Sequence, residues 1–459
     1  MEDKKINIGL FCDSFFPMID GVINVVDNYA KKLNQIANVT VFVPQGRDKD
    51  YVDNFPYNVV RCKKKFNCPG LDYDLPLPEL DVDFLDKLNE SNLDIVHIHS
   101  PFSMGKLGVN YAKKHKVPCV GTLHSQFKQD FYEATKMNSL TNILLNSAMS
   151  VFNKCDICWA VNEGIADLYR NDYKLNAPLA VQYNATDMVK HEFSQREMKK
   201  LDKKYGIKKD EHVFCFVGRL TILKNILFLV DVVEKLKQKG LKFKMLFVGT
   251  GTDEDKLINA IQKKNLSKDI ILTGRVSDKT ELGKFYSRAE LLLFPSPYDT
   301  DGLVKYEAAC YGTPVVSIKD FYCASNIIDN QTGFLTNNDI DSFADKIFEI
   351  CSNKELYDLV SKNCQEQLYK TWDTAVEKVF KDYLDIINKY NKGYYKELRK
   401  FVKTKNVQTK KIKSKKKQSQ KKRDKKVKTA NDKIEKLQKM INKQNEKINK
   451  IKNNIAKQG

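Results

Sequence analysis

Short apolar runs of strand length alternate along the chain with longer amphipathic stretches. This alternation is typical of parallel α/β domains, in which each strand is followed by a helix that returns the chain to the same edge of the sheet. Two series can be separated. The first predicts strands at Ile6–Phe11, Val39–Val43, Val59–Arg61, Ile95–His99, Cys119–Leu123 and Ile157–Val161, and closes near residues 181–184. The second predicts strands at Val213–Val217, Met245–Val248, Ile270–Thr273, Leu291–Phe294, Val315–Ile318 and Gly333–Leu335.

The two series predict two α/β domains of similar build. A polar, charge-rich stretch from Met188 to Glu211 separates them, and we interpret it as a linker with a short helix. Two doubly wound, Rossmann-like domains facing a crevice are the economical arrangement for this order of elements. A chain of 459 residues is long enough for two or three domains that each bury a core. The predicted divisions are 1–190, 191–370, a helix in 371–395 that continues the amphipathic pattern of Tyr369–Tyr390, and a Lys-rich tail in 396–459.

Charge is distributed unevenly between the body of the chain and its C-terminal tail. The formal net charge is +20. Residues 396–459 hold 25 Lys and Arg against 5 Asp and Glu, whereas residues 1–395 hold 53 of each sign. The body is therefore neutral and the whole surplus belongs to the tail, so the two parts need separate explanations.

The tail combines a solvated cationic run with an amphipathic repeat. The run Lys410–Lys428 is too highly charged to fold alone. Beyond it, apolar residues recur at alternating spacings of three and four, as in a coiled coil or a basic amphipathic helix. Flanking lysines would repel in a homodimer but attract an anionic membrane, so the pattern favours membrane over dimer. Nucleic acid is disfavoured because residues 410–459 have no aromatic side chain for base stacking. The repeat consists of Val427, Ala430, Ile434, Leu437, Ile441, Gln444, Ile448, Ile451 and Ile455.

Cysteine usage and the N-terminus indicate the compartment. The 11 cysteines are an odd number scattered through predicted strands and helices, which favours a reducing environment. Cys155 and Cys158 form a C-x-x-C without a second pair at zinc spacing, so we interpret them as packed thiols. The N-terminus lacks the apolar stretch of a signal peptide, and no run of ~18 apolar residues occurs. We expect a cytoplasmic protein.

The segment Phe294–Val316 carries the clearest chemistry. A buried strand ends there, a polar loop with Asp299 and Gly302 follows, and a helix with Glu307 leads to the next strand. Such a unit directs free helix N–H groups toward the crevice at the carboxyl end of the strand, where α/β proteins hold phosphates. We expect Glu307 roughly two turns into the helix, as a partner for ribose hydroxyls. The segment therefore predicts a nucleotide site.

Two cations follow the first strand of the second series. Gly218 ends that strand, Arg219 comes next, and Lys224 stands five residues later at the predicted start of a helix. Two cations at the mouth of a crevice suit a diphosphate. Gly249–Gly251, after the next strand, is similar to a dinucleotide-binding turn but lacks the third glycine.

The acidic loop resembles that of the retaining glycosyltransferases of family 4, which have the GT-B fold. Asp299 and Glu307 stand at the spacing of the family's acidic pair, with Gly302–Val304 between them. The family usually has Glu at the first position, so Asp299 is shorter by one methylene. The resemblance covers about residues 1–390. Within the family, the sequence most resembles the bacterial 1,2-diacylglycerol 3-glucosyltransferases.

The resemblance implies a role for individual residues. Arg219 and Lys224 would hold the donor's diphosphate, His124 would contact the transferred sugar, and Gly21 would lie in a loop close to both substrates. The implied catalytic residues are His124, Arg219, Lys224, Asp299 and Glu307. The implied donor-binding residues are Gly21, Gly218, Arg219, Lys224, Gly249, Val276, Ser296, Asp299, Thr300, Gly302, Leu303, Val304 and Glu307.

Two further histidines at the predicted crevice need a separate interpretation. His97 and His99 end the strand that neighbours the one before His124. A lone histidine is most often structural, so we interpret both as part of the fold.

The implied reaction is transfer of a hexose, glucose, from a UDP-sugar with retention at the anomeric carbon. Its transition state resembles an oxocarbenium ion leaving a diphosphate, whose charge Arg219, Lys224 and helix N–H groups would stabilise. No residue stands out as a covalent nucleophile, so the resemblance implies a front-face displacement in which the leaving phosphate helps to deprotonate the acceptor. The D-x-D sequence of Asp299 and Asp301 is interpreted as coincidence. No metal, and no cofactor beyond the UDP-sugar co-substrate, is expected.

The acceptor is less constrained than the donor. A membrane lipid such as diacylglycerol fits the resemblance, with the first domain as the acceptor side and the protein peripheral on the inner face of the cell membrane. Lys63–Lys65 and the amphipathic run Phe127–Phe152, with Lys128 and Lys136, are suited to an anionic bilayer. A transferase for a surface polysaccharide or a protein stays open. So does a non-catalytic binding protein whose tail contacts nucleic acid or a partner helix.

Overall fold

The computed structural model describes residues 5–18, 20–48, 50–67 and 74–399, together with Glu435, Lys436, Lys439 and Lys443. Residues 1–392 form one compact unit and residues 393–459 a second. The repeat predicted in the tail lies outside the described residues.

The first half of the compact unit is built on a seven-stranded parallel sheet. Its strand order is β3-β2-β1-β6-β7-β8-β9, and each neighbouring pair is parallel. An order that proceeds from β1 in both directions is that of a doubly wound sheet. The strands are β1 (Asn7–Phe11), β2 (Asn38–Pro44), β3 (Asn58–Cys62), β6 (Ile95–Ile98), β7 (Cys119–Leu123), β8 (Ile157–Ala160) and β9 (Leu179–Val181). The helices are α1 (Gly21–Leu33), α2 (Val82–Glu90), α3 (Ser103–His115), α4 (Phe127–Thr135), α5 (Asn138–Phe152) and α6 (Glu163–Asp167), and β4 (Lys65–Phe66) pairs separately with β5 (Leu75–Pro76).

The second half contains a six-stranded parallel sheet of the same kind. Its order is β12-β11-β10-β13-β14-β15, again parallel throughout. The strands are β10 (His212–Val217), β11 (Phe243–Val248), β12 (Ile270–Gly274), β13 (Leu291–Leu293), β14 (Val315–Ile318) and β15 (Phe334–Thr336). The helices are α7 (Gln195–Tyr205), α8 (Ile226–Gln238), α9 (Glu254–Lys263), α10 (Lys279–Arg288), α11 (Val304–Cys310), α12 (Ile340–Ser352) and α13 (Lys354–Asn363).

The predicted fold class is confirmed, because every predicted strand overlaps an observed one. The reason is visible in the burial: the central strands β1, β6, β7, β10 and β11 are almost wholly buried, as parallel strands covered on both faces must be. The interdomain stretch contains α7 as its short helix, which begins with a capping box formed by Ser194 and Glu197. None of the described cysteines forms a disulfide.

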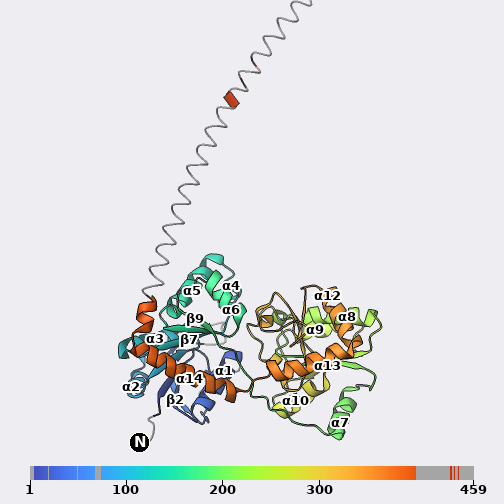
Figure 1. The fold of residues 1–459 in the computed structure, drawn as a ribbon, viewed down its shortest axis with the longest axis horizontal. Helices are drawn as coiled ribbons and strands as arrows, with labels where there is room; N and C mark the ends of the chain where they lie inside the picture. The colour runs from blue at the N-terminus through green and yellow to red at the C-terminus, as the bar shows by residue number, and fades with distance from the viewer. Residues whose placement is uncertain are drawn as a thin grey trace, which may run out of the picture. The chain divides into compact units, whose positions relative to one another are not determined.

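Helix α14 (Trp372–Asn391) returns from the second sheet to the first. It carries the amphipathic pattern predicted for Tyr369–Tyr390, and it packs against α1 (Figure 1). The Tyr383 hydroxyl of this helix lies 2.6 Å from His97 Nδ1, and Thr122 Oγ1 lies 2.6 Å from His97 Nε2. Both ring nitrogens of His97 are therefore used within the fold.

Candidate active site

A cavity of about 440 Å³ opens at the carboxyl ends of the strands in both halves of the compact unit. One wall comes from the start of α1 and the segment after β7, and the other from the segments after β10 and β13. This is where doubly wound sheets hold their ligands. The predicted site residues that line the cavity are Gly21, His124, Gly218, Arg219, Lys224, Asp299, Thr300, Gly302, Leu303, Val304 and Glu307.

Lys224 and Asp299 form an ion pair inside the cavity. Lys224 Nζ lies 2.7 Å from both carboxylate oxygens of Asp299, and the two side chains are only 13% and 20% exposed. Ser296 Oγ donates to Asp299 Oδ2 at 2.5 Å and so helps to hold the Asp299 carboxylate. Ser296 itself is not among the residues that line the cavity. Lys224 belongs to a 3₁₀ turn, Ile222–Lys224, that precedes α8, and not to the start of the helix as predicted. This turn brings the ammonium group across to the loop after β13.

Arg219 is the second cation of the cavity. Within the described ranges, no carboxylate lies at ion-pair distance from its guanidinium group, and the residue is exposed. Its positive charge acts on Tyr298, in the loop after β13, where it opposes the rise in the pKa of the Tyr298 hydroxyl that burial causes. Arg219 is therefore available to an anionic ligand without first breaking an ion pair.

Glu307 lies in the first turn of α11, which begins at Val304, and not two turns into a helix as predicted. The start of the helix is set by Gly302, whose φ of 72° suits glycine and whose added Cβ would meet the Phe294 ring at 2.6 Å. The Tyr286 hydroxyl donates to Glu307 Oε2 at 2.8 Å. Desolvation raises the pKa of Glu307, and the hydrogen bond from Tyr286 partly offsets that rise.

The glycines after β11 support the cavity from behind. A Cβ on Gly249 would lie 2.0 Å from the Gly218 carbonyl oxygen, and a Cβ on Gly251 would lie 2.2 Å from the Leu220 carbonyl oxygen. Backbone thus packs on backbone, and Leu220 N donates to Thr250 O at 2.9 Å. These glycines fix the loop that presents Gly218 and Arg219, while Gly249 does not itself line the cavity.

Val276 lies in a different cavity, of about 550 Å³, between α7 and the segment that joins β12 to α10. Its neighbours there include Lys200, Arg275 and Lys284. The predicted donor-binding residues are therefore gathered in one cavity except for Gly249, Val276 and Ser296.

His124 follows β7 and faces the acidic loop. Burial lowers the pKa of His124 to about 4, against an opposing effect of the Asp301 carboxylate. Its Nε2 lies 3.1 Å from His99 Nδ1, and the two rings stack with centroids 5.3 Å apart. The imidazole is therefore neutral at neutral pH and oriented by its neighbour.

Four polar groups at the carboxyl ends of β7, β8 and β9 grip the loop after β13, and the sequence reasoning did not identify three of them as site residues. Gln126 Nε2 donates to the carbonyl oxygens of Pro297 and Tyr298 at 2.9 and 2.8 Å. Asn162 Nδ2 donates to Thr300 O at 2.7 Å. Asn184 Nδ2 donates to Asp301 Oδ2, and Thr300 Oγ1 donates to His124 O, both at 2.7 Å. The available signal was position alone, since Gln126 and Asn162 lie within three residues after a predicted strand and Asn184 ends the predicted closing segment.

The D-x-D carboxylates are both engaged by lysines. Asp299 pairs with Lys224, and Asp301 pairs with Lys305 at 2.8 Å. Each carboxylate therefore has its own ammonium partner, and the two carboxylates do not share one. This arrangement does not resemble a divalent metal site, in which the carboxylates converge on one cation.

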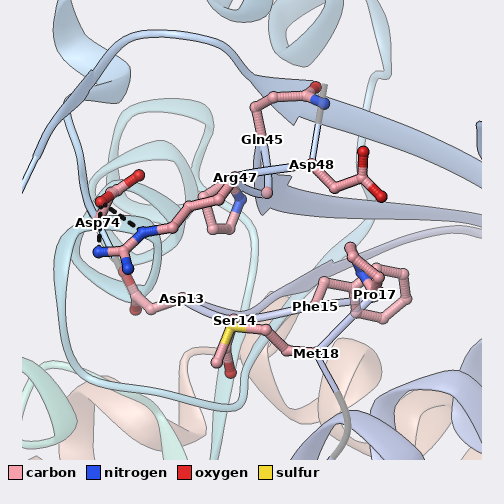
Figure 2. A pocket seen from close by; sticks show the side chains of 11 residues that line it. Asp13, Ser14, Phe15, Pro17, Met18, Gln45, Arg47, Asp48 and Asp74 are labelled. Atoms are coloured by element: carbon pink, nitrogen blue, oxygen red, sulfur yellow. Dashed lines mark hydrogen bonds and ion pairs between the residues drawn. The ribbon is translucent and has the colours of Figure 1, made fainter. Parts of the chain in front are cut away.

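A smaller cavity, of about 290 Å³, adjoins the carboxyl ends of β1 and β2 (Figure 2). Figure 2 shows Arg47 paired with Asp74, at 2.9 Å between Nη2 and Oδ1. Asp13 lines this cavity, but its Oδ1 accepts from Met104 N at 2.8 Å and its Oδ2 from Ser100 Oγ at 2.6 Å. The segment between β1 and α1 thus contributes to both cavities, with Asp13–Phe15 and Pro17 at the smaller and Gly21, at the start of α1, at the larger.

Both halves of the chain match described families. Residues 19–190 match the model of Glycosyltransferase Family 4, and residues 197–367 match that of Glycosyl transferases group 1. The Alpha-monoglucosyldiacylglycerol synthase of Acholeplasma laidlawii is 27% identical, over 84% of this chain and 99% of its own. The protein of the same name from Streptococcus pneumoniae is 25% identical, over 83% of this chain and 92% of its own.

The solved structures support the same fold. Anabaena Alr3699/HepE, solved in complex with UDP and glucose, matches with a TM-score of 0.63 at 17% identity, over 82% of this chain and 99% of its own. Sucrose-phosphate synthase from Thermosynechococcus elongatus matches with a TM-score of 0.64 at 17% identity, over 84% of this chain and all of its own. Within the described part of the chain, no helix has the length and apolar character needed to cross a membrane.

Proposed function

Because the chain belongs to the GT-B glycosyltransferases of group 1 and family 4, we propose that it transfers a hexose, glucose, from a UDP-sugar to a membrane lipid such as diacylglycerol, with retention at the anomeric carbon. The observation that carries the proposal is the single cavity that gathers His124, Arg219, Lys224, Asp299 and Glu307 from three separate segments of the chain, those after β7, β10 and β13. A non-catalytic binding protein would not need all five together. The names of the two diacylglycerol synthases support the lipid acceptor and the sugar.

The charges of the cavity suit departure of a diphosphate. Among the described residues no carboxylate pairs with Arg219, whereas Lys224 pairs with Asp299. A bound diphosphate therefore meets one cation at once and a second that it must share with Asp299. In the proposed front-face displacement the bond from the anomeric carbon to the UDP oxygen breaks, and the acceptor oxygen bonds to the same face. The acceptor proton passes to the leaving phosphate. The two cations stabilise the charge that develops there.

The remaining residues would orient the donor. Glu307, held by Tyr286, presents a carboxylate for the ribose hydroxyls. His124 is neutral, so it can offer a hydrogen bond to the transferred sugar without adding a charge that would oppose an oxocarbenium ion. Asp299 would bind sugar hydroxyls in place of the family's usual Glu. No metal and no further cofactor is required in this scheme.

The first-domain surface supports a membrane acceptor. The predicted run Phe127–Phe152 is divided into α4 and α5 by Lys136, whose φ is 51°. Its apolar side chains Met137 and Ile143 are 57% and 63% exposed, and Lys128 is also exposed. Exposed apolar side chains with lysines nearby suit the interface of an anionic bilayer, although Lys136 is also paired with Glu133. The protein would then be peripheral on the inner face of the cell membrane, with the basic tail as a second contact.

A direct assay tests the proposal. The purified protein is incubated with labelled UDP-glucose, other UDP-sugars and a bacterial membrane extract, and the label is followed into the lipid, polysaccharide and protein fractions. Label in a diacylglycerol lipid, with an α-anomeric linkage by NMR, is expected. Label only in polysaccharide or protein would replace the acceptor. No transfer from any UDP-sugar, despite UDP binding, would indicate a binding protein.

A further inference from the structure

A buried ion pair lies under the acidic loop of the active-site cavity. Asp301 and Lys305 are 3% and 1% exposed, and Lys305 Nζ lies 2.8 Å from Asp301 Oδ1. The same ammonium group donates to Cys323 O at 2.8 Å and to Asn326 Oδ1 at 2.6 Å. All three of its donors therefore have an acceptor, as a buried cation requires.

Both carboxylate oxygens of Asp301 have partners within the protein. Its Oδ1 also accepts from the Tyr306 hydroxyl at 2.9 Å, and its Oδ2 accepts from Asn184 Nδ2 at 2.7 Å. Asn184 is 6% exposed and comes from the segment after β9, in the first half of the molecule. Asp301 Oδ1 thus binds residues of its own domain, Lys305 and Tyr306, whereas Oδ2 binds Asn184 of the facing domain.

The neighbouring contacts act on the same short loop. Gln126, Asn162 and the backbone of His124 bind residues 297–300, immediately before Asp301. Asp299 lies within this gripped segment, between residues that are held from the opposite side of the cavity. The position of its carboxylate relative to His124 therefore depends on contacts made by other residues.

We propose that Asp301, fixed by Lys305 and joined to Asn184, is a positioning residue that sets the acidic loop across the cavity so that Asp299 and His124 address the same donor sugar. This inference rests on the proposed function. Both oxygens of Asp301 already accept hydrogen bonds or an ion pair from the protein, so the fold holds this carboxylate in place. A buried ion pair adds little net stability compared with apolar residues of similar volume, so its effect here is geometric. Loss of correct placement costs turnover while donor binding is kept.

The first test is Asn184→Ala, which removes the cross-domain hydrogen bond and leaves the ion pair intact. We expect kcat to fall about tenfold and the share of UDP-sugar hydrolysed instead of transferred to rise, while the Kd for UDP stays within about twofold. Hydrogen exchange in residues 297–303 should be at least about tenfold faster, a readout that does not need turnover. Asn34→Ala is the matched control, because the Asn34 amide also joins two segments, at the other end of α1, through Pro56 O at 2.7 Å.

The second test separates positioning from stability. Asp301→Leu leaves the Lys305 charge buried and should lower the melting temperature. The double variant Asp301→Leu with Lys305→Leu removes both charges and should recover most of that melting temperature. Its kcat should stay low, because the bond to Asn184 is still missing.

Four outcomes are informative. Recovery of kcat together with melting temperature in the double variant would show a purely structural pair and overturn the inference. A rise in donor KM without loss of kcat in Asn184→Ala would show that Asn184 serves donor binding and not placement of the loop, and would also overturn the inference. Unchanged exchange of residues 297–303 would do the same. A wild-type protein without transfer activity would refute the proposed function, and the exchange experiment would still decide whether Asn184 holds the loop.

Discussion

Lys224→Ala removes the cation that both holds Asp299 and faces the expected diphosphate. The pair is short, at 2.7 Å, and its side chains are 13% and 20% exposed, so it is poorly screened by solvent. Truncating one member of a desolvated, hydrogen-bonded charge pair costs about 2–5 kcal/mol of interaction free energy. Removing one preorganised donor from a transition state lowers kcat by about 10²–10³. Since each ~1.4 kcal/mol is a factor of ten, we expect kcat to fall by at least about 10².

The assay is glucose transfer from UDP-glucose to a detergent-dispersed acceptor, with initial rates over a range of donor concentrations. Lys244→Ala is the matched control, because the Lys244 side chain is 12% exposed and pairs with Glu211 at 3.7 Å, at the amino end of β11. The far-UV circular dichroism of both variants should equal that of the wild type. A Lys224→Ala enzyme with near-normal kcat would refute the assignment of the cavity to a nucleotide sugar.

The other predictions use the same assay or simple solution measurements. Glu307→Ala should lower kcat/KM at least about 10²-fold by removing a carboxylate from the ribose site, with Tyr286→Phe, which only frees that carboxylate, losing less. Asp299→Asn should impair the rate more than the melting temperature, whereas Asp299→Glu should be tolerated; an inactive Asp299→Glu protein would mean that the shorter side chain matches another sugar. Burial lowers the pKa of His124 to about 4, so on acidification the unfolded state binds a proton at this residue before the folded state does. The contribution of neutral His124 to the free energy of unfolding is therefore present above about pH 6.5 and is lost as the pH falls toward 4. His124→Asn should flatten the decline in melting temperature over this range, and an unchanged slope would count against a buried neutral imidazole. Removal of 396–459 should strongly weaken binding to acidic liposomes, since each Lys near an anionic surface contributes ~1 kcal/mol, and binding of the full-length protein should weaken as salt rises. Transfer to a dispersed acceptor should persist, whereas unchanged liposome binding with a change from dimer to monomer in sedimentation would favour the coiled coil instead.

The two acidic residues of the loop illustrate how local pattern and tertiary contact divide the information. The spacing of Asp299 and Glu307, with seven residues between them, is a local property of the sequence and needs no structure to be recognised. The pairing of Asp299 with Lys224 joins residues 75 positions apart and depends on how two loops meet. The predicted start of α11 differs from the observed one, which is Val304, because the packing of Gly302 on Phe294 sets it. Hydrophobic periodicity carries no information about such a contact.

The sequence by itself determined the two parallel sheets, their strands and the cations and carboxylates at the strand ends, because periodicity and strand-end polarity are local. It also located the whole charge surplus in the tail. Only the tertiary structure decided that Gly249 supports the Gly218 backbone from behind the cavity. Likewise, only folding showed that Asn184 meets the buried Asp301. An asparagine after a strand has no pattern of its own, and its role arises only when the facing domain brings a carboxylate to within hydrogen-bond distance.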